Sequence, residues 1–105
     1  RSAQAAFERV VSRDKSVLAA RARIGIGRLA LDAGAAEEAL AEFLKVALLY
    51  ADEEEVSLAL YLAGTALERM GDADKARAQY RELVQKHPAS AAAASARERL
   101  SELGE

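Results

Sequence analysis

The chain has 105 residues, of which 51% are hydrophobic and about a quarter are alanine, a share well above ordinary usage. This length and composition suit one domain with a continuous core. The net charge is −2 and no extended basic block is present, so a nucleic-acid partner is disfavoured. No apolar run reaches the roughly 18 residues of a membrane span, and direct membrane insertion is not expected. The absence of cysteine excludes disulfides and cysteine metal sites.

The first expected helix covers residues 1–13, where alanine, phenylalanine and valine recur at three- and four-residue steps. The same residue types return 36 residues later in the chain, inside a complete helical hairpin. Residues 1–16 are therefore interpreted as the second helix of a truncated repeat and its connection. A helix without its hairpin partner exposes one apolar flank, which favours self-association as a homodimer. The residues expected to mediate it are Ala3, Ala6, Phe7 and Val10.

Residues 17–53 are expected to form the first complete repeat. Ser16 can cap a helix over 17–33, and a partner helix is expected over 35–50. Gly25 and Gly27 form a GxG pattern, but no strand precedes it, so close helix packing is a better interpretation than phosphate binding. An acidic run follows at 52–55. Its carboxylates are expected at the start of the next helix, where they complement the helix dipole, and a cation site is the alternative.

Residues 54–88 are expected to form the second repeat. Apolar residues at three- and four-residue steps predict a helix that ends before Gly71, and Asp72 can cap the helix that follows. That second helix closes at His87-Pro88, because proline cannot continue a helix. Residues 89–105 then form a terminal capping helix that begins at Ser90. Its apolar stripe consists of Ala93, Ala96, Leu100 and Leu103.

The two hairpins share residue types at an offset of 37. The matched pairs are Gly27 and Gly64, Gly34 and Gly71, Ala39 and Ala76, Phe43 and Tyr80, and Val46 and Leu83. This pattern resembles the tetratricopeptide repeat, a helix-turn-helix unit of 34 residues. In that family a small residue lets the two helices cross closely, and the resemblance gives this role to both glycines of the first pair. We expect leucine at Gly64 to overpack the crossing, whereas alanine should be tolerated.

Some positions depart from the family pattern. Arg23 and Leu60 stand where tryptophan is frequent, and Ala51 replaces the proline that ends a unit, although Pro88 keeps it in the second repeat. The 36- and 37-residue spacings and the ending HPASAAAASARERL are similar to repeats of bacterial cell-envelope proteins, such as the Tol–Pal coordinator and the outer-membrane assembly lipoprotein. The resemblance implies a periplasmic or cell-envelope location, with the cytoplasm as the alternative.

The resemblance implies an all-α superhelical stack of about six helices that acts as a protein–protein interaction scaffold. First helices would line a concave groove that binds a protein or peptide segment. The implied groove residues are Arg21, Ile24, Arg28, Leu31, Leu58, Tyr61, Thr65 and Glu68. Arg21 and Arg28, two turns apart, could hold a carboxylate, although the chain lacks the asparagine that carboxylate-clamping members use. The alternatives are that the arginines are solvated and Ile24 fills a gap between helices, and that the repeats form a structural spacer.

No residue pattern indicates catalysis. His87 is the only histidine and stands at a helix end, where contact with the helix dipole is the expected role. No second histidine or cysteine is present to complete a metal site, and no positioned third group completes a serine triad. We therefore expect no enzymatic activity, no metal and no cofactor. A regulatory domain with a small-molecule pocket is a remoter alternative.

Overall fold

The computed structural model describes residues 16–104 as an all-helical chain. Its helices are α2 (Val17–Asp32), α3 (Ala36–Leu49), α4 (Glu53–Arg69), α5 (Ala73–Lys86) and α6 (Ala91–Glu102). These five agree with five of the expected helices. The sixth was expected in residues 1–13, and its proposed self-association residues Ala3, Ala6, Phe7 and Val10 lie outside the described residues.

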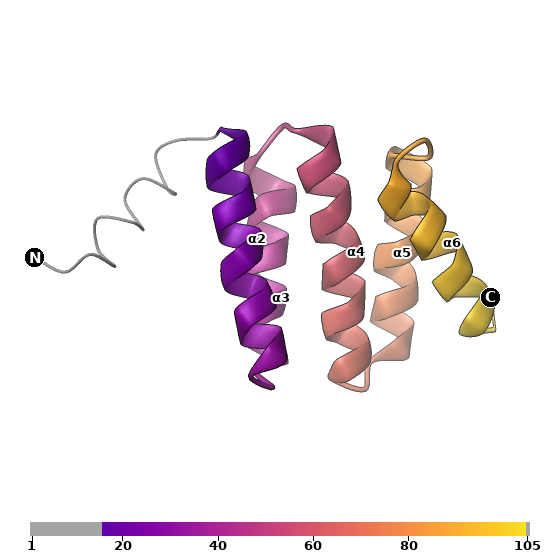
Figure 1. Ribbon diagram of the computed structural model, residues 1–105. Coiled ribbons are helices and arrows are strands. Elements are labelled where there is room, and N and C mark those ends of the chain that lie inside the picture. Colours follow the sequence, from indigo (N-terminus) through magenta and orange to yellow (C-terminus); the bar gives the residue numbers. More distant parts are fainter. Residues whose placement is uncertain (1–15, 105) are drawn as a thin grey trace, which may run out of the picture.

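The helices are stacked as two antiparallel hairpins and a terminal helix. α2 pairs with α3, and α4 pairs with α5, while α6 packs on both α5 and α4. Figure 1 shows α2, α4 and α6 in the nearer layer, with α3 and α5 behind them. The surface formed by α2, α4 and α6 is called the first-helix face below, and it includes the two helices, α2 and α4, on which the groove is expected.

Side-chain caps and glycines define the helix ends, as the sequence predicts. The hydroxyl or carboxylate oxygens of Ser16, Asp72 and Ser90 each accept a hydrogen bond from the backbone N–H three residues later, at 3.2, 3.1 and 3.0 Å. Gly34 and Gly71 end α2 and α4 with φ of +84° and +82°, a region that residues with a Cβ rarely adopt. The one tight turn within each hairpin follows from these residues.

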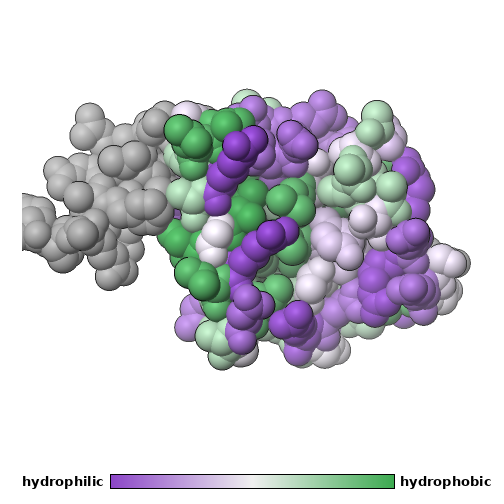
Figure 2. Space-filling view, viewed as in Figure 1, coloured by the Kyte–Doolittle hydropathy of each residue, from purple (hydrophilic) through white to green (hydrophobic). Residues whose placement is uncertain are grey.

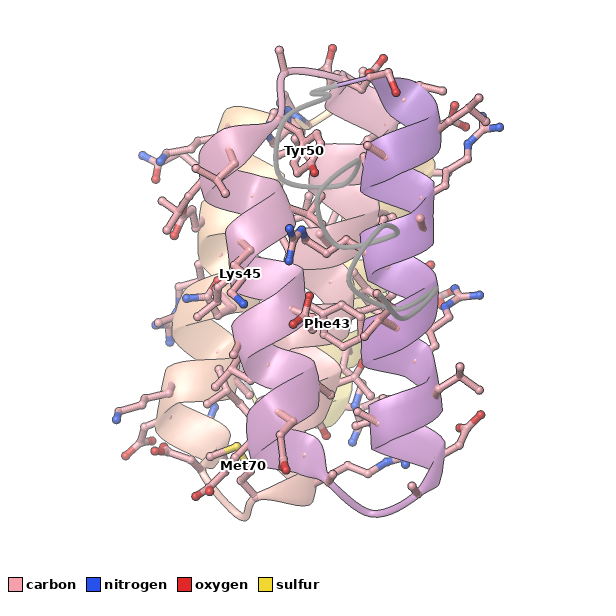
Figure 3. All side chains as sticks on the ribbon, turned by 90° about the vertical axis from the view of Figure 1, so that its left-hand side faces the viewer. Phe43, Lys45, Tyr50 and Met70 are labelled. Atoms are coloured by element: carbon pink, nitrogen blue, oxygen red, sulfur yellow. The ribbon has the colours of Figure 1, made fainter. Side chains whose placement is uncertain are left out.

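The core of each hairpin is an aromatic ring seated on a glycine. A Cβ atom added at Gly27 would lie 2.5 Å from the Phe43 ring, and one at Gly64 would lie 2.4 Å from the Tyr80 ring. Figure 3 shows Phe43 lying between α3 and α2. The expectation that alanine is tolerated at Gly64 is therefore wrong, because even a methyl group overlaps the buried ring. Gly25 has nothing within 4 Å of the same position, so close packing explains only Gly27 of the GxG pair.

The acidic run begins α4, as predicted. Asp52 is the N-cap residue and the three glutamates that follow it form the first turn. Glu55 is buried and accepts a hydrogen bond from Nε of Arg21 at 3.0 Å, so α2 and α4 are joined by an ion pair. Nδ1 of His87, the C-cap residue of α5, lies 3.3 Å from Oε2 of Glu53. Within residues 16–104, no three His, Asp or Glu side chains are grouped to hold a metal ion, and no helix is long and apolar enough to cross a membrane.

Candidate functional site

The candidate site starts with one face of α4. Tyr61, Thr65 and Glu68 follow one another at steps of four and three residues, so they project from the same side of the helix. All three are half-buried on the first-helix face. The Thr65 hydroxyl donates a hydrogen bond to the Tyr61 carbonyl at 3.3 Å, which leaves its methyl group available to neighbouring side chains.

The floor of the site is Tyr80 of α5. Its ring fills the space that Gly64 leaves open, and its centroid lies 5.6 Å from that of Tyr61 with the ring planes tilted by 41°. The Tyr80 hydroxyl donates a hydrogen bond to Oε2 of Glu68 at 2.6 Å. Burial, and secondly this carboxylate, hold the pKa of Tyr80 well above its ordinary value. The phenol therefore remains a neutral donor across the physiological range.

The third wall of the site comes from Arg99 of α6. Its Nε lies 3.0 and 2.8 Å from the two carboxylate oxygens of Glu68, and Nη2 lies 2.5 Å from Oε1. Nη1 donates to Glu102 on the same helix. The hydrogen bond from Arg99 lowers the pKa of Glu68, the Tyr80 hydroxyl lowers it further, and burial acts in the opposite direction. Glu68 is thus a charged carboxylate held by donors from both α5 and α6.

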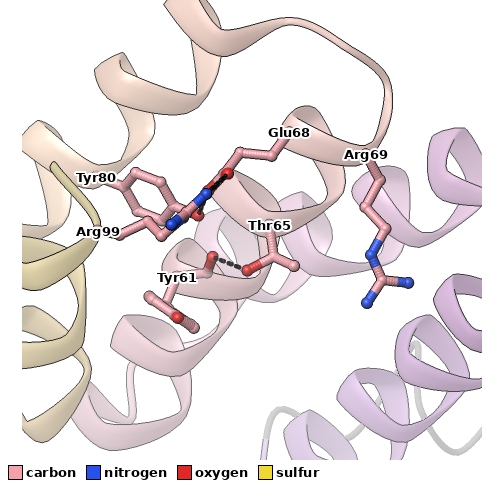
Figure 4. Close-up of a pocket in the computed structure, with 6 residues that line it drawn as sticks. All are labelled: Tyr61, Thr65, Glu68, Arg69, Tyr80 and Arg99. Carbon is pink, nitrogen blue, oxygen red and sulfur yellow. Dashed lines mark hydrogen bonds and ion pairs between the residues drawn. The ribbon is translucent and has the colours of Figure 1, made fainter. Parts of the chain in front are cut away.

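These side chains line a pocket of about 310 Å³ whose remaining rim is Arg69. Figure 4 shows the Glu68–Arg99–Tyr80 cluster on one side of the pocket and the Arg69 side chain extended on the other, toward α2. Arg69 Nη1 donates to the Leu31 carbonyl at 3.4 Å. Among residues 16–104 neither Arg69 nor Arg28 forms an ion pair. The pocket therefore offers an aromatic surface beside the guanidinium group of Arg69, which is not engaged with a carboxylate.

The residues implied for the groove divide into three groups. Tyr61, Thr65 and Glu68 line the pocket, whereas Ile24 and Leu31 are only 5% and 6% exposed and lie in the core, so the expectation that these two line a groove needs correction. They face inward because they share the helical side of the residues packed against α3. Arg21 is exposed but already holds Glu55, the chain's own carboxylate. Arg28 is exposed and Leu58 is half-buried.

Comparison with known protein families decides between helical-repeat architectures. A model of the family described as tetratricopeptide repeat matches residues 1–55, more than half of the chain, and a second model of the same description matches residues 58–90. The chain belongs to the tetratricopeptide repeat family. Searches against curated proteins and against solved structures found no match.

Sequence reasoning missed three pocket residues of this tetratricopeptide-repeat chain. Tyr80 was recognised as the aromatic of the second repeat, but not as a side chain that reaches the first-helix face through its hydroxyl. The sequence predicts α6 only as a capping helix and gives no sign of the role of Arg99, although α6 occupies the place of another first helix. Arg69, the last residue of α4, follows Glu68 directly. The signal that could have identified Arg99 is that α6 follows α5 as α4 follows α3, so that it continues the layer of first helices.

Proposed function

We propose that this chain binds an extended segment of a partner protein on its first-helix face, with the pocket between α4 and α6 as the anchoring point. Tetratricopeptide repeats generally mediate protein–protein interactions, and the family assignment supports that class of function. The single observation that carries the proposal is the pocket itself. It lies on the face that the resemblance implies for binding, and it includes three of the residues that the resemblance implies for the groove.

The chemistry of the pocket favours a segment that carries an apolar side chain beside an acidic one. The apolar group would lie on the Tyr61 ring and the Thr65 methyl group, since aromatic surfaces contribute strongly to binding. The acidic group would reach Arg69, with Arg28 further along α2. Glu68 is already saturated by Arg99 and Tyr80, so it would shape the pocket instead of binding the ligand directly.

If the repeats were a structural spacer instead of a binding module, this surface should look different. A spacer should have a groove filled by its own side chains, whereas a binding module leaves an open furrow. The pocket between α4 and α6 is an open hollow on this face, which favours binding at the C-terminal half of the face.

The test is a selection of random 12-residue peptides against the immobilised full chain. Tyr61→Ala and Arg69→Glu should each weaken the selected peptides at least tenfold, and Arg28→Glu should weaken acidic ones. Lys86→Glu on α5 is the charge-matched control and should leave binding unchanged. Association should also weaken as salt increases, because exposed charges are screened. Circular dichroism checks that helicity is retained. Failure to select any peptide, or equal losses in the Lys86→Glu control, would remove support for this face.

A second candidate function is self-association at the N-terminal end of the stack. Leu18 and Leu29 on α2 are 73% and 72% exposed, and Figure 2 shows apolar residues gathered over α2 on this face. The equivalent positions in the next repeat are buried beneath the preceding hairpin. The equivalents of Leu18, Gly25 and Leu29 are Glu55, Leu62 and Ala66. The exposed ridge on α2 therefore has the apolar composition that is buried against a neighbouring hairpin in the next repeat.

We expect a concentration-dependent homodimer that uses this ridge together with the apolar residues of 1–13. Sedimentation should show Leu29→Glu and Phe7→Glu shifting the chain toward monomer. Leu48→Glu is the matched control, because Leu48 is 82% exposed and its repeat equivalent Gln85 is exposed too. A chain that remains monomeric at high concentration contradicts this second function without affecting peptide binding.

The compartment remains an expectation from the sequence. The two family matches support the repeat family and do not distinguish its cell-envelope members from the others. A periplasmic location therefore belongs to the proposal, with the cytoplasm as its alternative. Fractionation of cells that express the natural protein would decide between them.

A further inference from the structure

The polar residues of the pocket differ from their equivalents one repeat earlier, at the offset of 37 that relates the two hairpins. The offset also relates α6 to α4, because it pairs buried residues: Ala93 with Val56, Ala96 with Ala59, and Leu100 with Ala63. Three polar residues of the pocket have apolar equivalents. The pairs, polar residue first, are Glu68 and Leu31, Tyr80 and Phe43, and Arg99 and Leu62. Glutamate and arginine thus stand in place of two leucines that are only 6% and 8% exposed and belong to one core cluster.

The three polar differences depend on one another. The Tyr80 hydroxyl donates to Oε2 of Glu68 at 2.6 Å, and Nη2 of Arg99 donates to Oε1 at 2.5 Å. Figure 4 shows the three side chains gathered on one side of the pocket. Any one of them placed alone among apolar neighbours would leave a poorly hydrated polar group without a partner, which is costly. The three residues therefore form a single unit, and the first hairpin has the apolar alternative.

Packing alone does not explain this unit. Well-packed apolar residues of similar size are often as stabilising as an ion pair, or more so. What the ion pair changes is the accessibility of the surface beside it. The side chains of Glu68 and Arg99 are 19% and 36% exposed. Tyr61, which lines the same pocket, is half-buried, whereas its equivalent Ile24 is only 5% exposed. The ion pair therefore occurs together with an aromatic ring that a ligand can reach.

We propose that the Glu68–Arg99 ion pair is the specificity-determining element of the pocket, because it keeps the Tyr61 ring accessible where two leucines would pack over that ring. The two charged groups bind each other and stay partly hydrated, so they form walls at the sides of the hollow. Leucines at the same positions would be driven onto the Tyr61 ring and the Thr65 methyl group by the hydrophobic effect. Both residues act by positioning, without contact to the ligand. The identity of that ligand, an apolar and acidic segment, rests on the proposed function.

The first test converts the ion pair into its apolar equivalent in the full chain. Hydroxyl-radical footprinting, resolved by mass spectrometry, reports the accessibility of individual side chains. In Glu68→Leu combined with Arg99→Leu, oxidation of Tyr61 should slow by roughly half or more as apolar groups cover its ring, and the urea midpoint should equal or exceed that of the parent. Glu68→Leu alone should lower the midpoint, since it leaves Arg99 without its main acceptor. Unchanged oxidation of Tyr61 in the double variant would overturn the proposal.

A matched control removes another ion pair in the same way. Lys86 and Glu82 lie 3.1 Å apart on α5, away from the pocket, so Glu82→Leu combined with Lys86→Leu should leave the oxidation of Tyr61 unchanged. Equal slowing in this control would show a general effect of added leucines and would also overturn the proposal.

The second test uses peptides selected on the parent chain. The double leucine variant at positions 68 and 99 should bind them at least about tenfold more weakly, the loss expected for one important contact. Arg99→Lys keeps the charge beside Glu68 and should retain both the binding and the oxidation rate of Tyr61. If the double leucine variant binds as the parent does, the ion pair does not determine access and the inference fails, although the pocket remains a binding site. If the parent selects no peptide, the proposed function fails, and footprinting alone decides whether the ion pair keeps Tyr61 accessible.

Discussion

Gly64→Ala tests whether the contact between α4 and α5 is as close as the structure indicates. The new methyl carbon would lie 2.4, 2.6 and 2.8 Å from three atoms of the Tyr80 ring, well inside van der Waals contact. The ring cannot easily move, because it is fully buried and its hydroxyl is held by Glu68. Overpacking costs about 1–3 kcal/mol, and the depth of this overlap places it at the upper end. Alanine recovers about 1 kcal/mol of helix propensity, so we expect a net loss of about 2 kcal/mol.

Urea denaturation followed by circular dichroism measures this loss directly. For a domain of this size each kcal/mol corresponds to roughly 4–8 °C in Tm. Gly25→Ala is the matched control, since it makes the same change in a helix with nothing within 4 Å, and it should stabilise by up to about 1 kcal/mol. Gly64→Leu should be worse than alanine. If Gly64→Ala were as stable as Gly25→Ala, the close approach of Tyr80 to α4 would be refuted.

Three further predictions concern single interactions. The folded chain holds the pKa of Glu68 below its ordinary value near 4.5. Glu68 therefore stabilises the fold above that pH, and this stabilisation is lost as the pH falls through the lowered pKa. In an acid titration of folding stability, Glu68→Gln should lack this contribution to the decrease. Arg21→Met should lower the urea midpoint by leaving Glu55 buried without its cation, and Arg21→Met combined with Glu55→Met should recover much of it. Ser90→Ala should cost about 1 kcal/mol through the lost cap of α6, measured by thermal denaturation.

Much of the fold could be predicted because local and periodic signals agree with the packing. Glycines with positive φ, oxygen-bearing caps and three- to four-residue apolar steps each fixed a boundary to within one or two residues. Gly27 and Phe43, together with Gly64 and Tyr80, could be paired by their common offset, and the structure brings each pair into contact. Such signals are contained in short stretches of chain, so one sequence suffices to read them.

The site was less predictable because its geometry depends on side chains far apart in sequence. Arg99 reaches Glu68 across 31 residues, and charged pairs at that separation have no periodic signature. Repeat positions alone also could not show how each first helix is rotated about its axis, and so which of its side chains face the core. Ile24 and Leu31 were therefore placed on a groove, whereas the rotation of α2 turns them into the core.

The Glu68–Arg99–Tyr80 cluster has a consequence for the local unfolding of α6. Helices with few packed neighbours open locally at lower free energy than the core of a fold. Among the described helices α6 packs on α5 and α4, its Arg99 forms a wall of the pocket, and its last turn is held by Arg77, whose Nη2 donates to the Leu103 carbonyl at 3.1 Å. Opening of α6 would therefore remove part of the proposed binding surface. If a partner segment binds in the pocket as proposed, its binding and the closure of α6 are linked equilibria, so the bound segment should slow amide exchange in α6 more than in α2.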